Sequence, residues 1–209
     1  MSAFLAQKVC ATVGFEKSMW TITIDGARIL LGAHINDFVI ACANQQVLDG
    51  FSARLLDAFE GTYVGALQHY LGCEVTRDME KVTTYLSQTH YAEEFQRAYN
   101  FWNATPRLTT MQPNTRLNKE DCDKNPAPDF HRCYRGIVSS LGYLVTITHP
   151  DLAWAYSELS KYVQFPGKIH MLAAEHVLCY LHGTWNKTIY YSRDSHENPN
   201  VLWGWVDAA

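Results

Sequence analysis

Residues 30–43 read LLGAHINDFVIACA, two apolar runs separated by the tetrapeptide His34-Ile35-Asn36-Asp37. Apolar and β-branched runs on either side of a short polar break are typical of two antiparallel strands joined by a tight turn. The stretch therefore predicts a β-hairpin whose tip presents an amide and a carboxylate.

The segments around this hairpin predict an antiparallel sheet with a helix against it. Residues 19–29 alternate between apolar and polar side chains and contain an Asp25-Gly26 turn, so we expect about three strands in all. Between residues 46 and 59, apolar side chains recur on one helical face, and Gly61 follows as a stop signal. Residues 3–13 have a looser helical spacing, which predicts a first helix there.

Beyond the sheet, the chain changes from mixed strands and helices to mainly helices. Two strand-like runs, YLGCEVTRD and KVTTYLSQ, precede a helix expected at 89–99. A proline-rich stretch over residues 104–130 predicts an extended, exposed connector. Three helical patterns follow, and they predict helices at 134–146, 152–163 and 170–181. After them come two strand-like runs, TIYYSRD and VLWGWVD.

Composition excludes several classes of protein. The chain has 209 residues, 47% of them hydrophobic, which is enough for a sizeable core and unlike a disordered protein. A formal charge of −4 provides no global basic field for a polyanion, so any nucleic-acid contact must be local. The six cysteines form no zinc-site spacing, and no segment resembles a signal peptide or a membrane span. We therefore expect an intracellular protein that does not enter a membrane.

In the order of its motifs, the chain resembles the reverse transcriptase of Ty1/copia-type retrotransposons. The matching segments are GAHINDFVIACA at the family's Y-x-D-D hairpin, HYLGCEVTRD, TYLSQTHYAEEF, TPRLTTMQP, YRGIVSSLGYLVTITHPDLAWAYSELSKYV and HMLAAEHVLCYLHGTWNKTIYY. The resemblance covers nearly all of residues 3–209 and implies an α+β fold in four parts. These are a partial palm with an antiparallel sheet and helices (1–103), the proline-rich connector (104–130), a helical thumb or connection unit (131–185) and the incomplete start of an RNase H-like domain (186–209).

The resemblance implies RNA-directed DNA polymerisation on an RNA/DNA primer-template with magnesium as the cofactor. Asp37 would bind the metal, whereas Asn36 stands where the family has the first aspartate of the pair. An asparagine carbonyl can coordinate a cation but adds no negative charge, so we expect weak magnesium binding. Asp207 matches the first metal-binding aspartate of the RNase H domain. Because of Asn36, and because the upstream palm segment is missing, we expect the chain to be inactive as a polymerase.

Other departures from the family pattern also remove charge. Thr148-His149-Pro150-Asp151 replaces the family's Thr-Arg-Pro-Asp, and Cys179 replaces an arginine. These changes favour the decay of an element that is no longer maintained over the adaptation of its sites to a new role. Two alternatives remain open: an open reading frame that does not fold stably, and a non-catalytic module that binds nucleic acid or protein. The cations available to such a module are Arg132, Arg135, Lys161, Lys168 and Lys187.

Simpler structural roles compete with each functional one. Asp37 could be a turn residue satisfied by its own backbone, and Asp207 an exposed carboxylate at the end of a strand. The six-residue spacing of His170, His176 and His182 drifts around a helix, so we expect surface or partly buried side chains and no metal site. Four aromatic residues could stack on bases but are expected in the core; they are Trp154, Tyr156, Tyr180 and Trp185.

Overall fold

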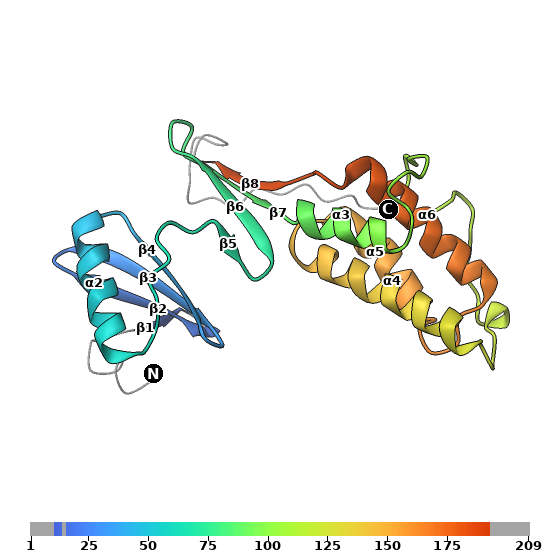
Figure 1. The fold of residues 1–209 in the computed structure, drawn as a ribbon, viewed down its shortest axis with the longest axis horizontal. Helices are drawn as coiled ribbons and strands as arrows, with labels where there is room; N and C mark the ends of the chain where they lie inside the picture. The colour runs from blue at the N-terminus through green and yellow to red at the C-terminus, as the bar shows by residue number, and fades with distance from the viewer. Residues whose placement is uncertain (1–10, 14–15, 193–209) are drawn as a thin grey trace. The chain divides into compact units, whose positions relative to one another are not determined.

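The computed structural model describes residues 11–13 and 16–192, and the chain separates into two compact units (Figure 1). Unit 1 comprises Met1–Leu67 and unit 2 comprises Gln68–Ala209. The division falls inside the range 1–103 that the resemblance assigns to a partial palm. Both units combine antiparallel strands with helices, as expected for an α+β fold.

Unit 1 is a four-stranded antiparallel sheet with one helix against it (Figure 1). The sheet order is β1-β2-β3-β4, and the bounds are β1 Ala11–Val13, β2 Glu16–Ile24, β3 Ala27–His34, β4 Asp37–Cys42 and α2 Gln45–Ala58. The prediction of a helix at 3–13 is wrong for Ala11–Val13, which pairs with β2; residues 3–10 lie outside the described part. Pairing with the neighbouring strand β2 overrides a weak helical spacing.

The core of unit 1 lies between one face of the sheet and α2. Ile22, Ile29 and Leu31 are buried from the strands, and Phe51 is buried from the helix. Leu30, between two of these residues in β3, points to the opposite face and is exposed. One face of the sheet is thus buried and the other is open within this unit.

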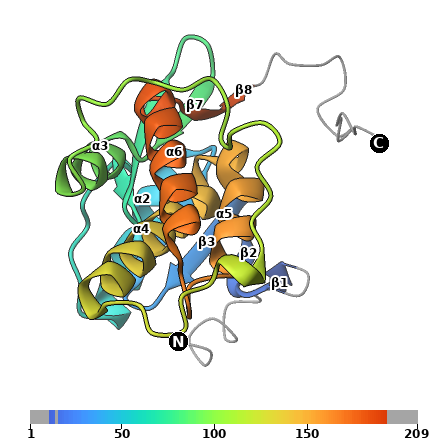
Figure 2. The ribbon, with the colours of Figure 1, turned by 90° about the vertical axis from the view of Figure 1, so that its right-hand side faces the viewer.

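Unit 2 begins with a second antiparallel sheet that the end of the chain completes. Its order is β5-β6-β7-β8, and the bounds are β5 His69–Tyr70, β6 Cys73–Asp78, β7 Thr83–Ser87 and β8 Ile189–Ser192. Ile189 of β8 is the register partner of Leu86 in β7, and Figure 2 shows the two strands side by side. Residues 189–192, inside the range expected to start an RNase H-like domain, therefore form part of this sheet.

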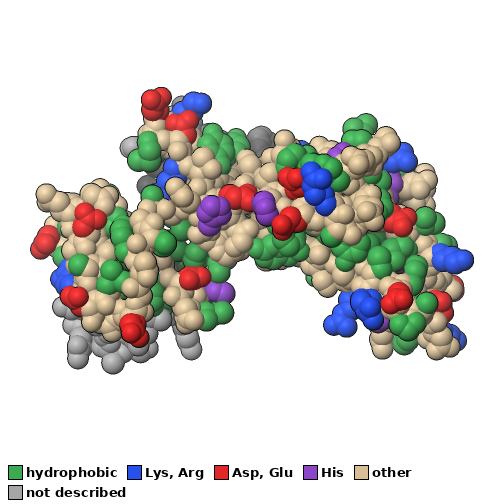
Figure 3. Space-filling model, in the orientation of Figure 1, with side chains coloured by type: hydrophobic (Ala, Val, Ile, Leu, Met, Phe, Trp, Pro, Cys, Tyr) green, Lys and Arg blue, Asp and Glu red, His purple; other side chains and the backbone are tan. Residues whose placement is uncertain are grey.

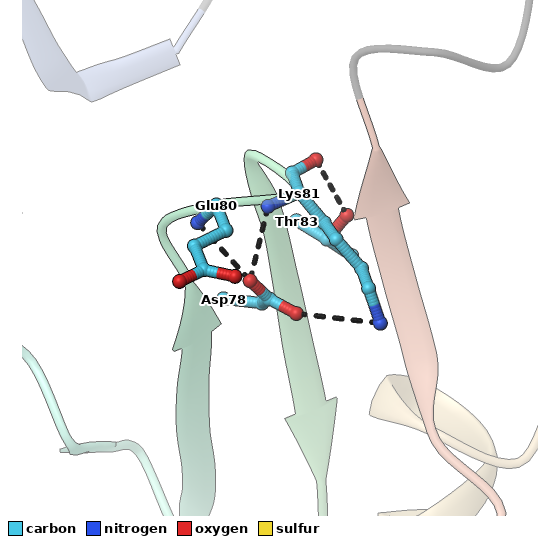
Figure 4. Close-up of polar contacts among 4 residues, drawn as sticks. All are labelled: Asp78, Glu80, Lys81 and Thr83. Carbon is cyan, nitrogen blue, oxygen red and sulfur yellow. Dashed lines mark hydrogen bonds and ion pairs between the residues drawn. The ribbon is translucent and has the colours of Figure 1, made fainter.

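The turn between β6 and β7 is organised by Asp78 (Figure 4). Its Oδ1 atom accepts hydrogen bonds from the backbone N–H groups of Lys81, at 3.0 Å, and Glu80, at 3.1 Å. The Lys81 ammonium lies 3.6 Å from Oδ2. The Lys81 backbone N–H in particular favours the ionised carboxylate and lowers the pKa of Asp78 below its ordinary value. The contribution of this turn to stability is therefore present above about pH 4 and is lost as pH falls below it.

The helices of unit 2 pack around a continuous apolar core. Tyr134, Leu141 and Leu178 are among its fully buried members, and the Tyr134 hydroxyl donates a hydrogen bond to the Leu159 carbonyl at 2.8 Å. The bounds are α3 Thr89–Ala98, η1 Lys119–Asp121, α4 Pro128–Ile147, η2 Pro150–Leu152, α5 Ala153–Ser160 and α6 Lys168–Thr184. Helix α4 begins six residues earlier than predicted because Pro128 occupies its first turn.

Glu74 of β6 fastens the sheet of unit 2 to α3. Its carboxylate accepts hydrogen bonds from the Ser87 hydroxyl and from the backbone N–H groups of Thr89, at 3.1 Å, and His90, at 3.3 Å. These two N–H groups belong to the first turn of α3, which has no partner for them inside the helix. An anion at this position also interacts favourably with the helix dipole.

Replacement of Glu74 by alanine removes three hydrogen bonds to a carboxylate at once. We expect the free energy of unfolding of unit 2 to fall by about 2 kcal/mol, measured by urea denaturation at pH 7. Glu94→Ala is the matched control, because Glu94 is largely exposed and only approaches His90 at 3.6 Å. It should change stability by less than about 0.5 kcal/mol. Equal effects of the two substitutions would contradict the role given to Glu74.

The connector, residues 104–127 in the structure, is mostly exposed but is bound along α6. The Arg107 backbone N–H donates to the Cys179 carbonyl at 3.2 Å, and His176 Nε2 lies 3.0 Å from the Thr109 carbonyl. Met111 is buried in the core of unit 2. The connector is therefore attached to the helices at several points and is not a free linker.

The three histidines of α6 make specific contacts. His176 and His182 are partly buried, as predicted, and His182 Nδ1 lies 3.1 Å from Gln96 Oε1. The prediction is wrong for His170, which is 0% exposed and stacks on the Tyr162 ring with centroids 4.0 Å apart. The connector covers this side chain, and a helical spacing alone does not reveal that.

Candidate functional site: the hairpin tip and a basic end of unit 2

The β3–β4 hairpin has the tight turn that residues 30–43 predict. His34 and Asp37 are paired across the strands, so the loop consists of Ile35 and Asn36 alone. Ile35 has φ +54° and is 82% exposed. A positive φ at the first loop position suits the twist of a two-residue hairpin, but it strains a β-branched residue.

Both candidate metal ligands lie at this tip and are exposed. In the described part of the chain, no hydrogen bond or ion pair joins the Asn36 or Asp37 side chain to another residue. The alternative in which Asp37 is satisfied by its own turn therefore finds no support in the geometry. The carboxylate and the amide oxygen are free to meet a ligand from solvent.

These two residues fit a divalent cation only in part. Asp37 provides one carboxylate and Asn36 one neutral oxygen, whereas hard cations bind best where several charged oxygens converge. Among the residues that the structure describes, no group of three or more His, Cys, Asp and Glu side chains is placed to hold a metal ion. The described residues therefore do not form a complete polymerase metal site.

Ile35→Gly should relieve the strain at the tip. Glycine adopts a positive φ without a steric penalty, so we expect the free energy of unfolding of unit 1 to rise by about 1 kcal/mol. The measurement is urea denaturation followed by the fluorescence of Trp20, a partly buried residue of unit 1. Val39→Gly, inside β4, should instead destabilise the unit. At that position glycine relieves no strain and increases the chain entropy that is lost on folding. A loss of stability with Ile35→Gly would contradict the strained turn.

Four of the five candidate nucleic-acid cations lie at one end of the helices of unit 2. His131 Nε2 lies 2.8 Å from the Val163 carbonyl, which brings the start of α4 beside the segment between α5 and α6. Arg132 and Arg135 are exposed near the first of these residues, and Lys161 and Lys168 near the second. In Figure 3, Lys and Arg side chains with acidic ones among them lie over unit 2.

Acidic neighbours offset part of this charge. Arg132 lies 3.4 Å from Asp129, and Lys161 forms an ion pair with Glu158. Within the described residues, Arg135 and Lys168 have no such partner. Lys187 follows the opposite end of α6, whose 17 residues span roughly 25 Å, so it does not join this group.

One of the four aromatic candidates lies outside its expected place in the core. Trp154 is 58% exposed, so that prediction is wrong; it points outward from α5 while Ala155 and Leu159 point inward. Tyr156, Tyr180 and Trp185 are partly buried against the core. An exposed indole on this helix is available for contact with a partner.

His149, at the position where the resemblance implies an arginine, is fully buried. Neither ring nitrogen has a hydrogen-bond partner among the described residues, and Nδ1 lies 3.6 Å from Asp151 Oδ1. Asp151 also accepts a hydrogen bond from the Tyr180 hydroxyl at 2.8 Å. His149 first, and then Tyr180, favour the ionised carboxylate of Asp151 and lower its pKa, whereas burial opposes this shift. Because His149 Nδ1 lies 3.6 Å from the carboxylate, its influence is electrostatic and not a direct hydrogen bond.

The remaining candidate, Asp207, lies outside the described residues. None of the described helices is both long and apolar enough to cross a membrane.

A helix-backed antiparallel sheet with a carboxylate at a hairpin tip is compatible with a fragment of a nucleic-acid polymerase. The model of the family "Reverse transcriptase (RNA-dependent DNA polymerase)" matches residues 1–113, more than half of the chain. The chain belongs to this family, and its similarity to transposon Pol polyproteins confirms the resemblance to copia-type retrotransposons.

Three curated relatives are described as retrovirus-related Pol polyproteins from transposons. TNT 1-94 of Nicotiana tabacum is 27% identical over 86% of this chain and 14% of its own length. RE1 and RE2 of Arabidopsis thaliana are 28% and 30% identical over 87% of this chain and 12% of their own lengths. The chain thus spans only about an eighth of these polyproteins. No solved structure matches it.

Proposed function

We propose that the chain is a segment of an RNA-directed DNA polymerase that binds nucleic acid but does not polymerise by itself. The observation that carries this proposal is the hairpin tip, where Asn36 and Asp37 are both exposed and only one is a carboxylate. Polymerases use divalent metal ions to stabilise the attacking and leaving oxygens of nucleotidyl transfer. Asp37 would hold such an ion, preferably magnesium, and Asn36 would contribute too little charge to retain it tightly.

The first experiment is primer extension by the purified chain with an RNA/DNA primer-template and magnesium. We expect no extension, and Asn36→Asp alone should not restore it, because one added carboxylate does not complete a two-metal arrangement. Extension by the wild-type chain above a no-enzyme control would overturn the proposed inactivity.

Metal binding tests the role of the tip without requiring activity. Asn36→Asp should tighten Mn²⁺ binding by about tenfold, or about 1.4 kcal/mol, because a second carboxylate adds negative charge beside Asp37. Asp37→Asn should abolish binding, and both can be measured by titration with Mn²⁺ as a paramagnetic substitute. Asp25→Asn, in the turn between β2 and β3, is the matched control and should leave binding unchanged. Unchanged binding in Asn36→Asp would contradict the proposed ligand pair.

Nucleic-acid binding is proposed for the basic end of unit 2, where Arg135 and Lys168 carry unpaired charges. Phosphate contacts release counterions, so affinity for a labelled primer-template should fall steeply as salt rises. Arg135→Ala with Lys168→Ala should reduce the logarithmic salt slope by about 2 in fluorescence anisotropy. Lys187→Ala, at the other end of α6, should change it less. Absence of salt-sensitive binding in a folded chain would exclude this role.

We also propose that the start of the RNase H-like domain follows β8. The support is the segment VLWGWVDA, which resembles the first strands of that domain and includes Asp207. Asp207→Asn should leave the anisotropy measured for the basic end unchanged, because that residue belongs to a separate metal site. An intracellular location is likewise proposed, because the cysteines among the described residues are free and none of them forms a disulfide.

A further inference from the structure

His170 closes the first turn of α6 in an unusual way. It is the third residue of the helix, and its Nδ1 atom accepts a hydrogen bond from the backbone N–H of Gly167, the N-cap residue, at 2.9 Å. Glutamate or glutamine normally makes this reciprocal bond in a capping box. Because Nδ1 must accept, it cannot carry a hydrogen.

The other ring nitrogen holds the connector. His170 Nε2 lies 3.2 Å from the Asn118 carbonyl, and since Nδ1 is an acceptor, Nε2 carries the hydrogen and donates it. The ring also stacks on Tyr162, whose hydroxyl donates to the Leu117 carbonyl at 2.7 Å. Two hydrogen bonds thus select one neutral tautomer and join α6 to residues 117–118.

Gly167 brings the connector against the same point. A Cβ atom at this position would lie 1.8 Å from the Asp121 carbonyl oxygen, so the backbones approach too closely for any side chain. The region between Leu117 and Asp121 is therefore seated on the N-terminus of α6, and His170 lies at the centre of the contact.

We propose that His170 is a protonation-sensitive latch: its neutral ring holds residues 117–122 on α6, and its protonated ring releases them. A proton on Nδ1 would point at the Gly167 N–H, so two donors would face each other and the cap would break. This repulsion displaces the ring, and although the protonated ring keeps its Nε2 hydrogen, the displacement removes both the Asn118 bond and the stacked Tyr162 support from the connector.

The surroundings set the direction of the pH dependence. Burial lowers the pKa of His170, while the Asn118 carbonyl and the Asp121 carboxylate oppose that shift. Tyr162, from the segment after α5, also faces the ring, and burial raises the pKa of its hydroxyl, which therefore stays neutral near neutral pH. The other charged side chains of the segments that meet here are Lys168 on α6 and Lys119 and Glu120 on η1. The latch is thus fully closed above about pH 6.5 and opens as pH falls towards the lowered pKa of the folded state.

Amide hydrogen exchange of the full 209-residue chain tests the latch. We expect protection factors at residues 117–122, corrected for intrinsic exchange, to fall by up to about tenfold per pH unit below about pH 6.5. His170→Gln should remove this dependence, because a glutamine oxygen can accept the Gly167 N–H at every pH. His176→Gln is the matched control and should retain the pH dependence. His176 donates a hydrogen bond to the Thr109 carbonyl, and it can do so in both charge states, so it does not contribute to that dependence.

A measurement on the wild-type chain makes the outcome independent of how the variants fold. Nitrogen-15 shifts of the His170 ring should show the Nε2–H tautomer at pH 7.5, and its titration should coincide with loss of protection at residues 117–122. A Nδ1–H tautomer, titration without loss of protection, or an unchanged pH dependence in folded His170→Gln would each overturn the proposal.

Discussion

Leu141→Ala should lower the free energy of unfolding of unit 2 by about 3 kcal/mol. Leu141 is fully buried in α4 and belongs to the core formed by α3, α4, α5 and α6. Truncation removes the transfer free energy of the missing carbons and leaves a cavity that close-packed neighbours refill only in part. Urea denaturation followed by circular dichroism at 222 nm measures the change.

Leu108→Ala is the control for this substitution. Leu108 is 97% exposed on the connector, so the same chemical change should alter stability by less than about 0.5 kcal/mol. A chain that loses equal stability from both substitutions would lack the packed core. It would then agree with the alternative in which the open reading frame does not fold stably.

Gly167→Ala should destabilise unit 2 by about 3 kcal/mol, at the upper end of the overpacking range. The new methyl group would overlap the Asp121 carbonyl oxygen, and two segments of backbone yield less easily than a flexible side chain. Protection of the connector amides should be lost even at pH 7.5, where His170 is neutral. Denaturation therefore measures the loss of stability, and hydrogen exchange on the same sample measures the loss of the contact between the connector and α6.

Gly50→Ala makes the same change where space is open. Gly50 lies inside α2 of unit 1, and nothing approaches within 4 Å of the position of an added Cβ. Alanine favours a helix interior over glycine, so we expect stability to rise by up to about 1 kcal/mol. If both glycine variants changed stability in the same direction, the close approach at Gly167 would not be real.

Asn36 stands where the resemblance implies an aspartate, and this difference concerns cation binding more than the fold. The hairpin forms its two-residue turn with Asn36 in place, so its backbone does not depend on a second carboxylate at the tip. Ligand charge affects cation affinity much more than it affects a two-residue turn. We therefore expect an exchange of asparagine and aspartate at position 36 to change cation affinity while the hairpin persists.

Local patterns in the sequence predicted much of the fold. The β3–β4 hairpin, α2 and the helices of unit 2 follow from apolar periodicity and turn residues that act within a few positions of one another. The same patterns place Asn36 and Asp37 at a hairpin tip, and the family resemblance then makes them candidate ligands. The family resemblance was legible because its motifs occur in order along the chain.

Contacts between distant residues decided the rest. β8 joins β7 about a hundred residues away in the chain. The grouping of Arg135 with Lys168 and the burial of His170 depend on how helices and connector pack. No local spacing contains that information. What the sequence by itself determined is the set of elements and the chemistry at the hairpin tip, because both depend on neighbours along the chain. Only the tertiary structure decided that β8 pairs with β7, that Arg135 and Lys168 lie at the same end of unit 2, and that His170 is buried. These outcomes depend on packing between segments that are far apart in the sequence.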